Sequence, residues 1–162
     1  MRLSVPFFIL LLLSACGAGQ SAKGPALGYD LPSASNPANG LLLIYRPKQS
    51  WRAAARQYPE VRIDGTPIGS LKYNGYLQFE ASPGQHQLTL TGLSEEASRW
   101  DFKDRSVPVT LRAGETTYVQ VVARFDETSN TLGSPGMGHE LQLTPVGEEQ
   151  ARYSLPGMKE SK

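Results

Sequence analysis

The feature that most constrains the fold is a series of short stretches in which apolar and polar residues alternate. The stretch TTYVQVVARF, residues 116–125, places apolar side chains two residues apart at Val119, Val121, Ala123 and Phe125. Successive side chains of a β-strand point to opposite faces, so this period predicts a strand with one buried face. Eight stretches are expected to be strands: 41–45, 60–64, 66–73, 76–81, 86–92, 106–111, 116–125 and 139–146.

Turn-forming residues separate these stretches at intervals of roughly 8–12 residues, as in sandwiches and barrels. The turn dipeptides are Asp64-Gly65, Asn74-Gly75, Pro83-Gly84 and Ala113-Gly114. Asp-Gly and Asn-Gly favour tight hairpins, and Pro67 restricts its stretch to a sheet edge or a strand start. We therefore predict an all-β, antiparallel, immunoglobulin-like β-sandwich of about seven to eight strands. The residues expected to face its core include Val61, Ile63, Leu77, Phe79, Ala81, Leu88, Leu90, Val107, Val109, Leu111, Leu141 and Leu143.

Helix signals are few. Ser50 can cap a short helix over residues 51–57, and residues 147–155 can form a short C-terminal helix. The predicted strands lie within residues 41–155, a length that suits one sandwich domain. Residues 156–162 are expected to be a C-terminal tail.

The N-terminus has the layout of a lipoprotein signal peptide. Residues 3–13 form an apolar run behind Met1-Arg2, and this run is too short to span a bilayer. The sequence Leu13-Ser14-Ala15-Cys16 resembles the lipobox of bacterial lipoproteins, in which cleavage between Ala15 and Cys16 is coupled to attachment of diacylglycerol to the thiol. The resemblance implies that residues 1–15 are removed and that Cys16, the only cysteine, is the lipid attachment point. The alternative is an ordinary signal peptide cut near Ala15 or Ala18.

Residues 16–40 are rich in Gly, Ala, Ser and Pro and show no apolar period, which predicts a disordered, flexible tether behind the lipidated cysteine. Within this stretch, Tyr29 and Leu31 are able to dock locally. Removal of residues 1–15 takes Arg2 from the 16 basic residues and none of the 15 acidic residues, so the net charge becomes zero. A neutral chain is a poor candidate for binding nucleic acid. Gly17 is compatible with sorting to the outer membrane, facing the periplasm.

Three motifs carry a second resemblance. They are Tyr45-Arg46-Pro47 at the end of a strand, Asp64-Gly65 followed by Ile68-Gly69, and Pro83-Gly84 followed by His86. Together they resemble an uncharacterised family of bacterial lipoproteins, a domain of unknown function with an immunoglobulin-like or transthyretin-like sandwich. The resemblance covers most of residues 41–155 and implies this fold, but no activity.

The sequence indicates no catalytic residue, metal or cofactor. A metal or acid–base site would have to join His86 and His139 to Asp101, Asp104 or Asp126, and no ligand spacing typical of metal sites is present. No G-x-S-x-G motif occurs. We expect each histidine to bond a turn carbonyl at the rim of the sandwich. A hydrolase site near His86 or His139 is the alternative.

The candidate binding residues are Arg46, Trp51, Arg52, Arg56 and Trp100. If residues 48–56 are helical, Lys48, Arg52 and Arg56 lie on one face and Trp51 on another. Such a cationic ridge beside an exposed tryptophan suits an acidic or sugar partner. The alternative is a solvated face whose tryptophan closes one end of the core, and the same choice applies to Trp100.

These features together predict a lipid-anchored lipoprotein of the cell envelope that acts as a non-catalytic binding or adaptor module. The expected partners are the membrane, through acyl chains on Cys16, and an envelope protein or peptidoglycan. The alternatives are an envelope hydrolase and a sugar-binding module that uses Trp51 or Trp100.

Overall fold

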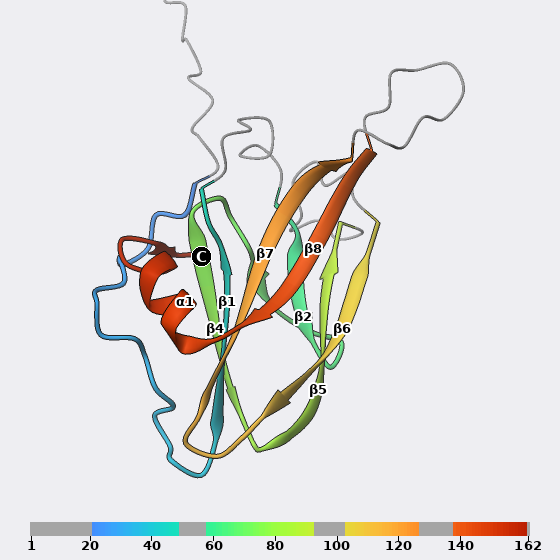
Figure 1. Cartoon of the computed structure of the whole chain (residues 1–162). Coiled ribbons are helices and arrows are strands. Elements are labelled where there is room, and N and C mark those ends of the chain that lie inside the picture. The colour runs from blue at the N-terminus through green and yellow to red at the C-terminus, as the bar shows by residue number, and fades with distance from the viewer. Residues whose placement is uncertain (1–20, 49–57, 93–102, 127–137, 162) are drawn as a thin grey trace, which may run out of the picture.

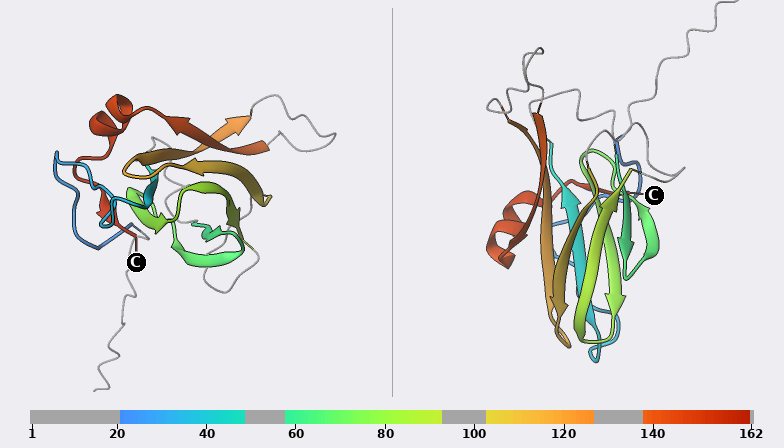
Figure 2. Two further views of the ribbon diagram at one scale, coloured as in Figure 1. Left: turned by 90° about the horizontal axis from the view of Figure 1, so that it is seen from below. Right: turned by 90° about the vertical axis from the view of Figure 1, so that its right-hand side faces the viewer.

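The computed structural model describes residues 21–48, 58–92, 103–126 and 138–161, which form two β-sheets packed face to face (Figure 1). One sheet has five strands in the order β8-β7-β1-β4-β9, and the other has four in the order β3-β2-β5-β6. Figure 2 shows the sheets edge on as two layers, with a short helix outside the five-stranded sheet. The predicted all-β sandwich is confirmed.

The elements follow the chain in order, and their bounds are β1 Gly40–Arg46, β2 Glu60–Ile63, β3 Thr66–Ser70, β4 Gly75–Ala81, β5 Gly84–Thr91, β6 Arg105–Leu111, β7 Thr116–Asp126, β8 Gly138–Val146, α1 Glu148–Ser154 and β9 Lys159–Glu160. Each of the eight predicted strands corresponds to one of β1–β8, and β9 was not predicted.

The core between the sheets is built from the alternating faces of the strands. Leu88 and Leu90 of the four-stranded sheet lie there as expected, and they meet Leu77 of β4 and Val119 and Val121 of β7 from the five-stranded sheet. The remaining predicted core residues are also present: Val61, Ile63, Phe79, Ala81, Val107, Val109, Leu111, Leu141 and Leu143. The side chains of Ala123 and Phe125 lie outside the described residues.

Strand β1 is buried on both faces, which explains why its sequence is a continuous apolar run instead of an alternating one. Leu42 and Ile44 point into the core between the sheets. Leu43 and Tyr45 point outward into a second apolar cluster, where they meet residues of α1 and the chain termini. The members of this outer cluster are Leu43, Tyr45, Tyr76, Tyr118, Ala151, Leu155 and Met158, with Leu27, Leu31 and Val146 packed against them.

Two of the predicted turns have different roles. Asp64 and Gly65 have φ values of 51° and 80° and form the two-residue turn of the β2–β3 hairpin, as expected. Asn74 also has a positive φ of 55°, but β3 and β4 belong to different sheets, so the Asn74-Gly75 turn carries the chain across the sandwich. Two pairs of neighbouring strands depart from the predicted antiparallel arrangement, because β7 runs parallel to β1 and β9 runs parallel to β4. The remaining pairs of neighbouring strands are antiparallel.

The prediction of a flexible tether over residues 16–40 is wrong for the part that the structure describes. Residues 21–39 run along the outside of the sandwich and are bonded to it at several points. The Leu27 N–H donates to the Met158 carbonyl at 2.8 Å, and Ala22 is buried. Of the two residues expected to dock locally, Leu31 packs against the outer cluster, whereas Tyr29 is 84% exposed.

Glu80 binds residues 35–39 of the same segment through hydrogen bonds. Its carboxylate accepts the backbone N–H groups of Ser35 at 2.7 Å and Asn36 at 3.0 Å, the Ser35 hydroxyl at 2.7 Å, and the Asn39 side-chain amide at 3.0 Å. These bonds lower the pKa of Glu80 to about 2, and the bond from the Ser35 hydroxyl has the largest effect.

The chain beyond residue 155 also belongs to the fold and is not a free tail. The short helix α1 was predicted, and β9 then pairs with the start of β4. Met158 and Ser161 are buried. The Ser161 hydroxyl accepts the Lys72 backbone N–H at 2.6 Å and donates to the Ser70 carbonyl at 2.8 Å.

The sandwich has two distinct ends. At the turn end lie the short connections Asp64–Gly65, Ser82–Pro83 and Arg112–Glu115. At the opposite end, here called the loop end, strands start or finish at Arg46, Glu60, Thr91, Arg105, Asp126 and Gly138. The described N-terminal segment also begins at the loop end, because Ser21 pairs with Tyr73 just before β4.

Candidate functional site

The candidate binding residues Trp51, Arg52, Arg56 and Trp100 lie outside the described residues. The flanking residues fix only where their segments attach. Residues 48 and 58 border the first segment and residues 92 and 103 border the second, and all four belong to the loop end. The sequence-based prediction that these residues bind a partner therefore stays a prediction, now with both segments attached to the same end of the sandwich.

Arg46, which the sequence suggested as a candidate binding residue, is not exposed for binding. It is the last residue of the central strand β1, where it pairs with Gly75, and it is fully buried. Burial lowers the pKa of Arg46 to about 10, partly opposed by the nearby Tyr73. Arg46 is buried because β1 is covered on both faces, which leaves its side chains no route to solvent.

His86 is fixed at the turn end by two hydrogen bonds. Its Nδ1 lies 2.7 Å from Oδ2 of Asp64 and its Nε2 lies 3.0 Å from the carbonyl oxygen of Ser82, which is the turn carbonyl expected from the sequence. The ring also meets Phe79 edge-on, with centroids 6.2 Å apart. Asp64 additionally accepts the Gln87 backbone N–H at 2.8 Å.

This geometry favours the doubly protonated imidazole, because both partners of the ring are acceptors. The bond to Asp64, followed by the bond to Ser82, raises the pKa of His86. The Gln87 N–H, followed by the His86 ring, lowers the pKa of Asp64. In the doubly protonated form both ring nitrogens donate, so this form of His86 has no lone pair for a metal ion or for a proton in catalysis.

The other members of the considered metal or acid–base set do not join His86 among the described residues. Asp104 lies at the loop end, where it accepts the Thr91 hydroxyl at 2.9 Å. Asp101 and the side chains of Asp126 and His139 lie outside the described residues. Within the described ranges, no group of three or more His, Cys, Asp or Glu residues is placed to hold a metal ion.

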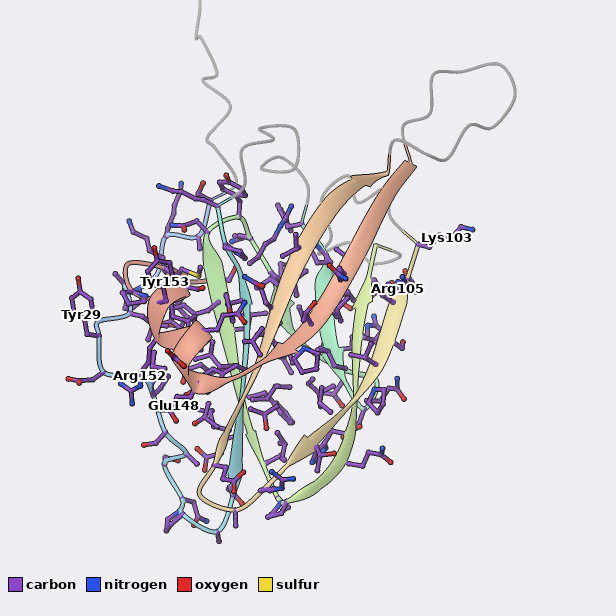
Figure 3. The ribbon with its side chains drawn as sticks, viewed as in Figure 1. Tyr29, Lys103, Arg105, Glu148, Arg152 and Tyr153 are labelled. Atoms are coloured by element: carbon purple, nitrogen blue, oxygen red, sulfur yellow. The ribbon has the colours of Figure 1, made fainter. Side chains whose placement is uncertain are left out.

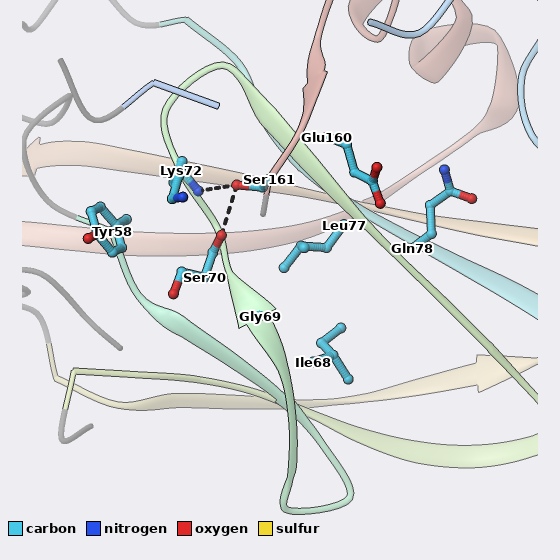
Figure 4. Close-up of a pocket in the computed structure, with 9 residues that line it drawn as sticks. All are labelled: Tyr58, Ile68, Gly69, Ser70, Lys72, Leu77, Gln78, Glu160 and Ser161. Atoms are coloured by element: carbon cyan, nitrogen blue, oxygen red, sulfur yellow. Dashed lines mark hydrogen bonds between the residues drawn. The ribbon is translucent and has the colours of Figure 1, made fainter. Parts of the chain in front are cut away.

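A polar cleft of about 270 Å³ lies between the edge strand β3 and the β4–β9 edge of the other sheet (Figure 4). Its lining includes Tyr58, Lys72, Gln78 and Glu160, and the bonded hydroxyl of Ser161 joins its two sides. Sequence analysis missed this cleft, because it depends on the C-terminal strand pairing with β4. Its mixed cationic, anionic and hydroxyl lining suits a small polar group.

A second groove of about 430 Å³ lies between the N-terminal segment and α1. Glu148 and Arg152 of α1 line it and form an ion pair at 2.5 Å. Figure 3 shows these two residues on the same side of the molecule as Tyr29 and Tyr153, which are 84% and 92% exposed. This side of the five-stranded sheet therefore carries both large exposed aromatic side chains identified among the described residues.

Comparison with known proteins adds a family but no function. A family model described as "Protein of unknown function (DUF2846)" matches residues 36–134, which is more than half of the chain. Neither a curated protein nor a solved structure matches the chain. Within the described ranges, no helix is long and apolar enough to cross a membrane.

Proposed function

The chain belongs to the DUF2846 family, and we propose that it is a lipid-anchored, non-catalytic binding or adaptor module of the bacterial cell envelope. The anchor in this proposal is Cys16, acylated after cleavage behind Ala15. The lipobox-like sequence Leu13–Cys16 supports it, together with the short apolar run that precedes it. Gly17 favours the outer membrane, with the domain facing the periplasm.

The observation that carries the binding role is the grouping of long connections at one end of a well-packed sandwich. Segments 49–57, 93–102 and 127–137 attach at the loop end, whereas the connections at the turn end are short. Binding residues are found disproportionately on loops that a rigid scaffold positions. Trp51, Arg52, Arg56 and Trp100 lie in two of these segments.

The bonding of His86 supports a non-catalytic role. A hydrolase with a histidine base needs a ring nitrogen that can take a proton from a nucleophile. In His86 both nitrogens are engaged by acceptors, Asp64 Oδ2 and the Ser82 carbonyl. The alternative hydrolase would therefore have to break this arrangement or use His139.

The test is cross-linking in intact cells, followed by mass spectrometry of what is captured with the acylated protein. A discrete envelope protein that is captured with the wild type and lost with Cys16→Ser is the expected result. The Cys16→Ser variant is the matched control, because it removes the anchor and leaves residues 21–161 unchanged. Capture of no protein above background would count against an adaptor.

Two further variants separate the alternatives. Alanine at both His86 and His139 should leave the role in cells unchanged if the module only binds, and abolish it if the protein is a hydrolase. Alanine at both Trp51 and Trp100 should abolish binding to isolated peptidoglycan if the partner is a glycan, and should leave that binding unchanged otherwise.

A further inference from the structure

The groove between the N-terminal segment and α1 is a surface that the proposed function does not use. Its floor is formed by Thr116 and Tyr118 of β7, and its walls are residues 31–33 and the helix. Residues 114–115 of the turn before β7 complete the lining. The volume of about 430 Å³ lies in the range typical of small-molecule sites, about 300–1,000 Å³. The groove is therefore large enough for a ligand, and its whole lining belongs to the described part of the chain.

The groove offers both hydrogen-bond donors and acceptors. Arg152 donates to Oε1 of Glu148 through Nε at 2.9 Å and through Nη2 at 2.5 Å, which leaves Nη1 and the second carboxylate oxygen for a ligand. The Thr116 hydroxyl donates to the Pro32 carbonyl at 3.2 Å and still has lone pairs that can accept. Burial raises the pKa of Tyr118, the hydrogen bond to Thr116 opposes this, and the charges of Glu148 and Arg152 act in opposite directions. The Tyr118 hydroxyl thus lies close to these three groups.

The elements around the groove carry more acidic than basic residues. Residues 27–33, 112–118 and 147–155 contain the acids Asp30, Glu115, Glu148 and Glu149 and the bases Arg112 and Arg152. Anionic ligands are therefore disfavoured. The two glutamates that line the groove are each paired with an arginine, Glu148 with Arg152 at 2.5 Å and Glu115 with Arg112 at 3.3 Å. Such pairs present donors and acceptors side by side without an unpaired charge, which suits a neutral ligand with many hydroxyl groups.

Two exposed tyrosines lie at the rim of this groove. Tyr29 is two residues before Leu31, which lines the groove, and Tyr153 directly follows Arg152. Their side chains are 84% and 92% exposed, and Figure 3 shows both on the same side of the molecule as Arg152. Because one helical turn has 3.6 residues, Tyr153 lies on the face of α1 opposite the buried Ala151. A tyrosine ring has an apolar face and a polar tip, so it can pack against the C–H face of a sugar ring.

We propose that this groove binds a neutral glycan chain of N-acetylated sugars, with one ring in the groove and its neighbours against Tyr29 and Tyr153. Each sugar hydroxyl both donates and accepts, which matches the ion pair and the hydroxyl groups of the lining. Leu31 and Pro32 provide an apolar wall for the methyl of an acetamido group. The inference goes beyond the proposed function, since this site excludes the loop-end segments and needs no lipid on Cys16. Only the identification of the chain as peptidoglycan rests on the proposed envelope location.

The experiment measures binding of the N-acetylglucosamine tetramer to the full-length protein in detergent by isothermal titration calorimetry. We expect the tetramer to bind, and Tyr29→Ala and Tyr153→Ala each to weaken the binding by about fivefold or more. The phenylalanine variants at both positions keep the ring and should retain most of the affinity. Gln85→Ala changes an exposed residue of β5 in the other sheet and should leave binding unchanged. All three positions are exposed, so these changes should preserve the fold.

Three outcomes would overturn the inference. The first is the absence of binding heat up to about 5 mM tetramer. The second is binding that both tyrosine variants retain but that alanine at Trp51 and Trp100 abolishes, because the sugar site would then belong to the loop end. The third is tetralysine binding more tightly than the sugar, which would mean that the acidic surroundings select a cationic peptide. Since the assay needs neither a membrane nor an acyl group, a missing lipid on Cys16 counts against the proposed function alone.

Discussion

Replacement of Ser161 by alanine tests whether the last residues of the chain are an integral part of the fold. Ser161 is 1% exposed, and its hydroxyl is bonded to the backbone of the connection that leaves β3. The Ser161→Ala change removes the acceptor at 2.6 Å from the Lys72 N–H and the donor at 2.8 Å from the Ser70 carbonyl. The methyl group fits the same space, so the change removes bonds and adds no clash.

The expected loss follows from the burial of these bonds. A buried backbone group that loses a hydrogen-bond partner costs about 1–3 kcal/mol, so we expect the free energy of unfolding to fall by about 2 kcal/mol. For a domain of this size, a loss of about 2 kcal/mol corresponds to a decrease in Tm of roughly 6–10 °C.

Thermal unfolding followed by circular dichroism is the assay, and Ser106→Ala is the matched control. The Ser106 hydroxyl is also hydrogen-bonded, to Thr89 Oγ1 at 2.8 Å, but on an exposed face. That change should stay within about 0.5 kcal/mol of the wild type. If Ser161→Ala melts within about 1 °C of the wild type, the C-terminal strand does not contribute to the stability as argued.

Three other substitutions give distinct outcomes. Because the pKa of His86 is raised in the folded protein, its hydrogen bonds stabilise the fold below about pH 6.5, and this stabilisation is lost as pH rises through the folded pKa. The urea midpoints of the wild type and of His86→Gln should therefore converge in alkaline solution. A difference that stays constant with pH would contradict the bonding described for His86. The pKa of Glu80 is lowered to about 2, so its contribution to the free energy of unfolding is present above the ordinary glutamate pKa and is lost as pH falls through about 2. The stability of Glu80→Gln should therefore depend less on pH in acid than that of the wild type, and hydrogen exchange at residues 35–39 should be faster. In Gly75→Ala the new Cβ would lie 2.7 Å from that of Ala22, so we expect a fall in Tm and faster exchange at the Ala22 amide, and unchanged exchange there would argue against the docked N-terminal segment.

The strands could be predicted from the sequence because their signals are local. Alternation along β5 placed Leu88 and Leu90 in the core, and the Asp64-Gly65 dipeptide identified a two-residue hairpin. Neither inference required knowledge of the partner strand. The Ser82 carbonyl was foreseeable as a partner of His86 for the same reason, since it lies four residues away, whereas Asp64 lies 22 residues away.

The parts that could not be predicted depend on contacts between distant residues. Residues 21–39 have the composition of a linker, and they are structured through contacts with distant residues, such as the bonds to Glu80, up to 45 residues away, and to the last strand. Ser161 bonds to Ser70 across 91 residues. The burial of Arg46 depends on the β7 and β4 neighbours of its strand, which no pattern within residues 41–48 reveals.

The outer apolar cluster shows why the two flanks of the chain are required for the fold of this family member. The matched family region, residues 36–134, includes β1–β7 but excludes β8, α1, β9 and the docked residues before 36. A chain cut at those limits would uncover Leu43, Tyr45 and Tyr118 on the outer face, and β7 would become an edge strand with unpaired backbone groups. Uncovered aromatic and leucine side chains beside a free edge favour aggregation. Residues 21–39 therefore cover the sheet in addition to linking the domain to its proposed anchor.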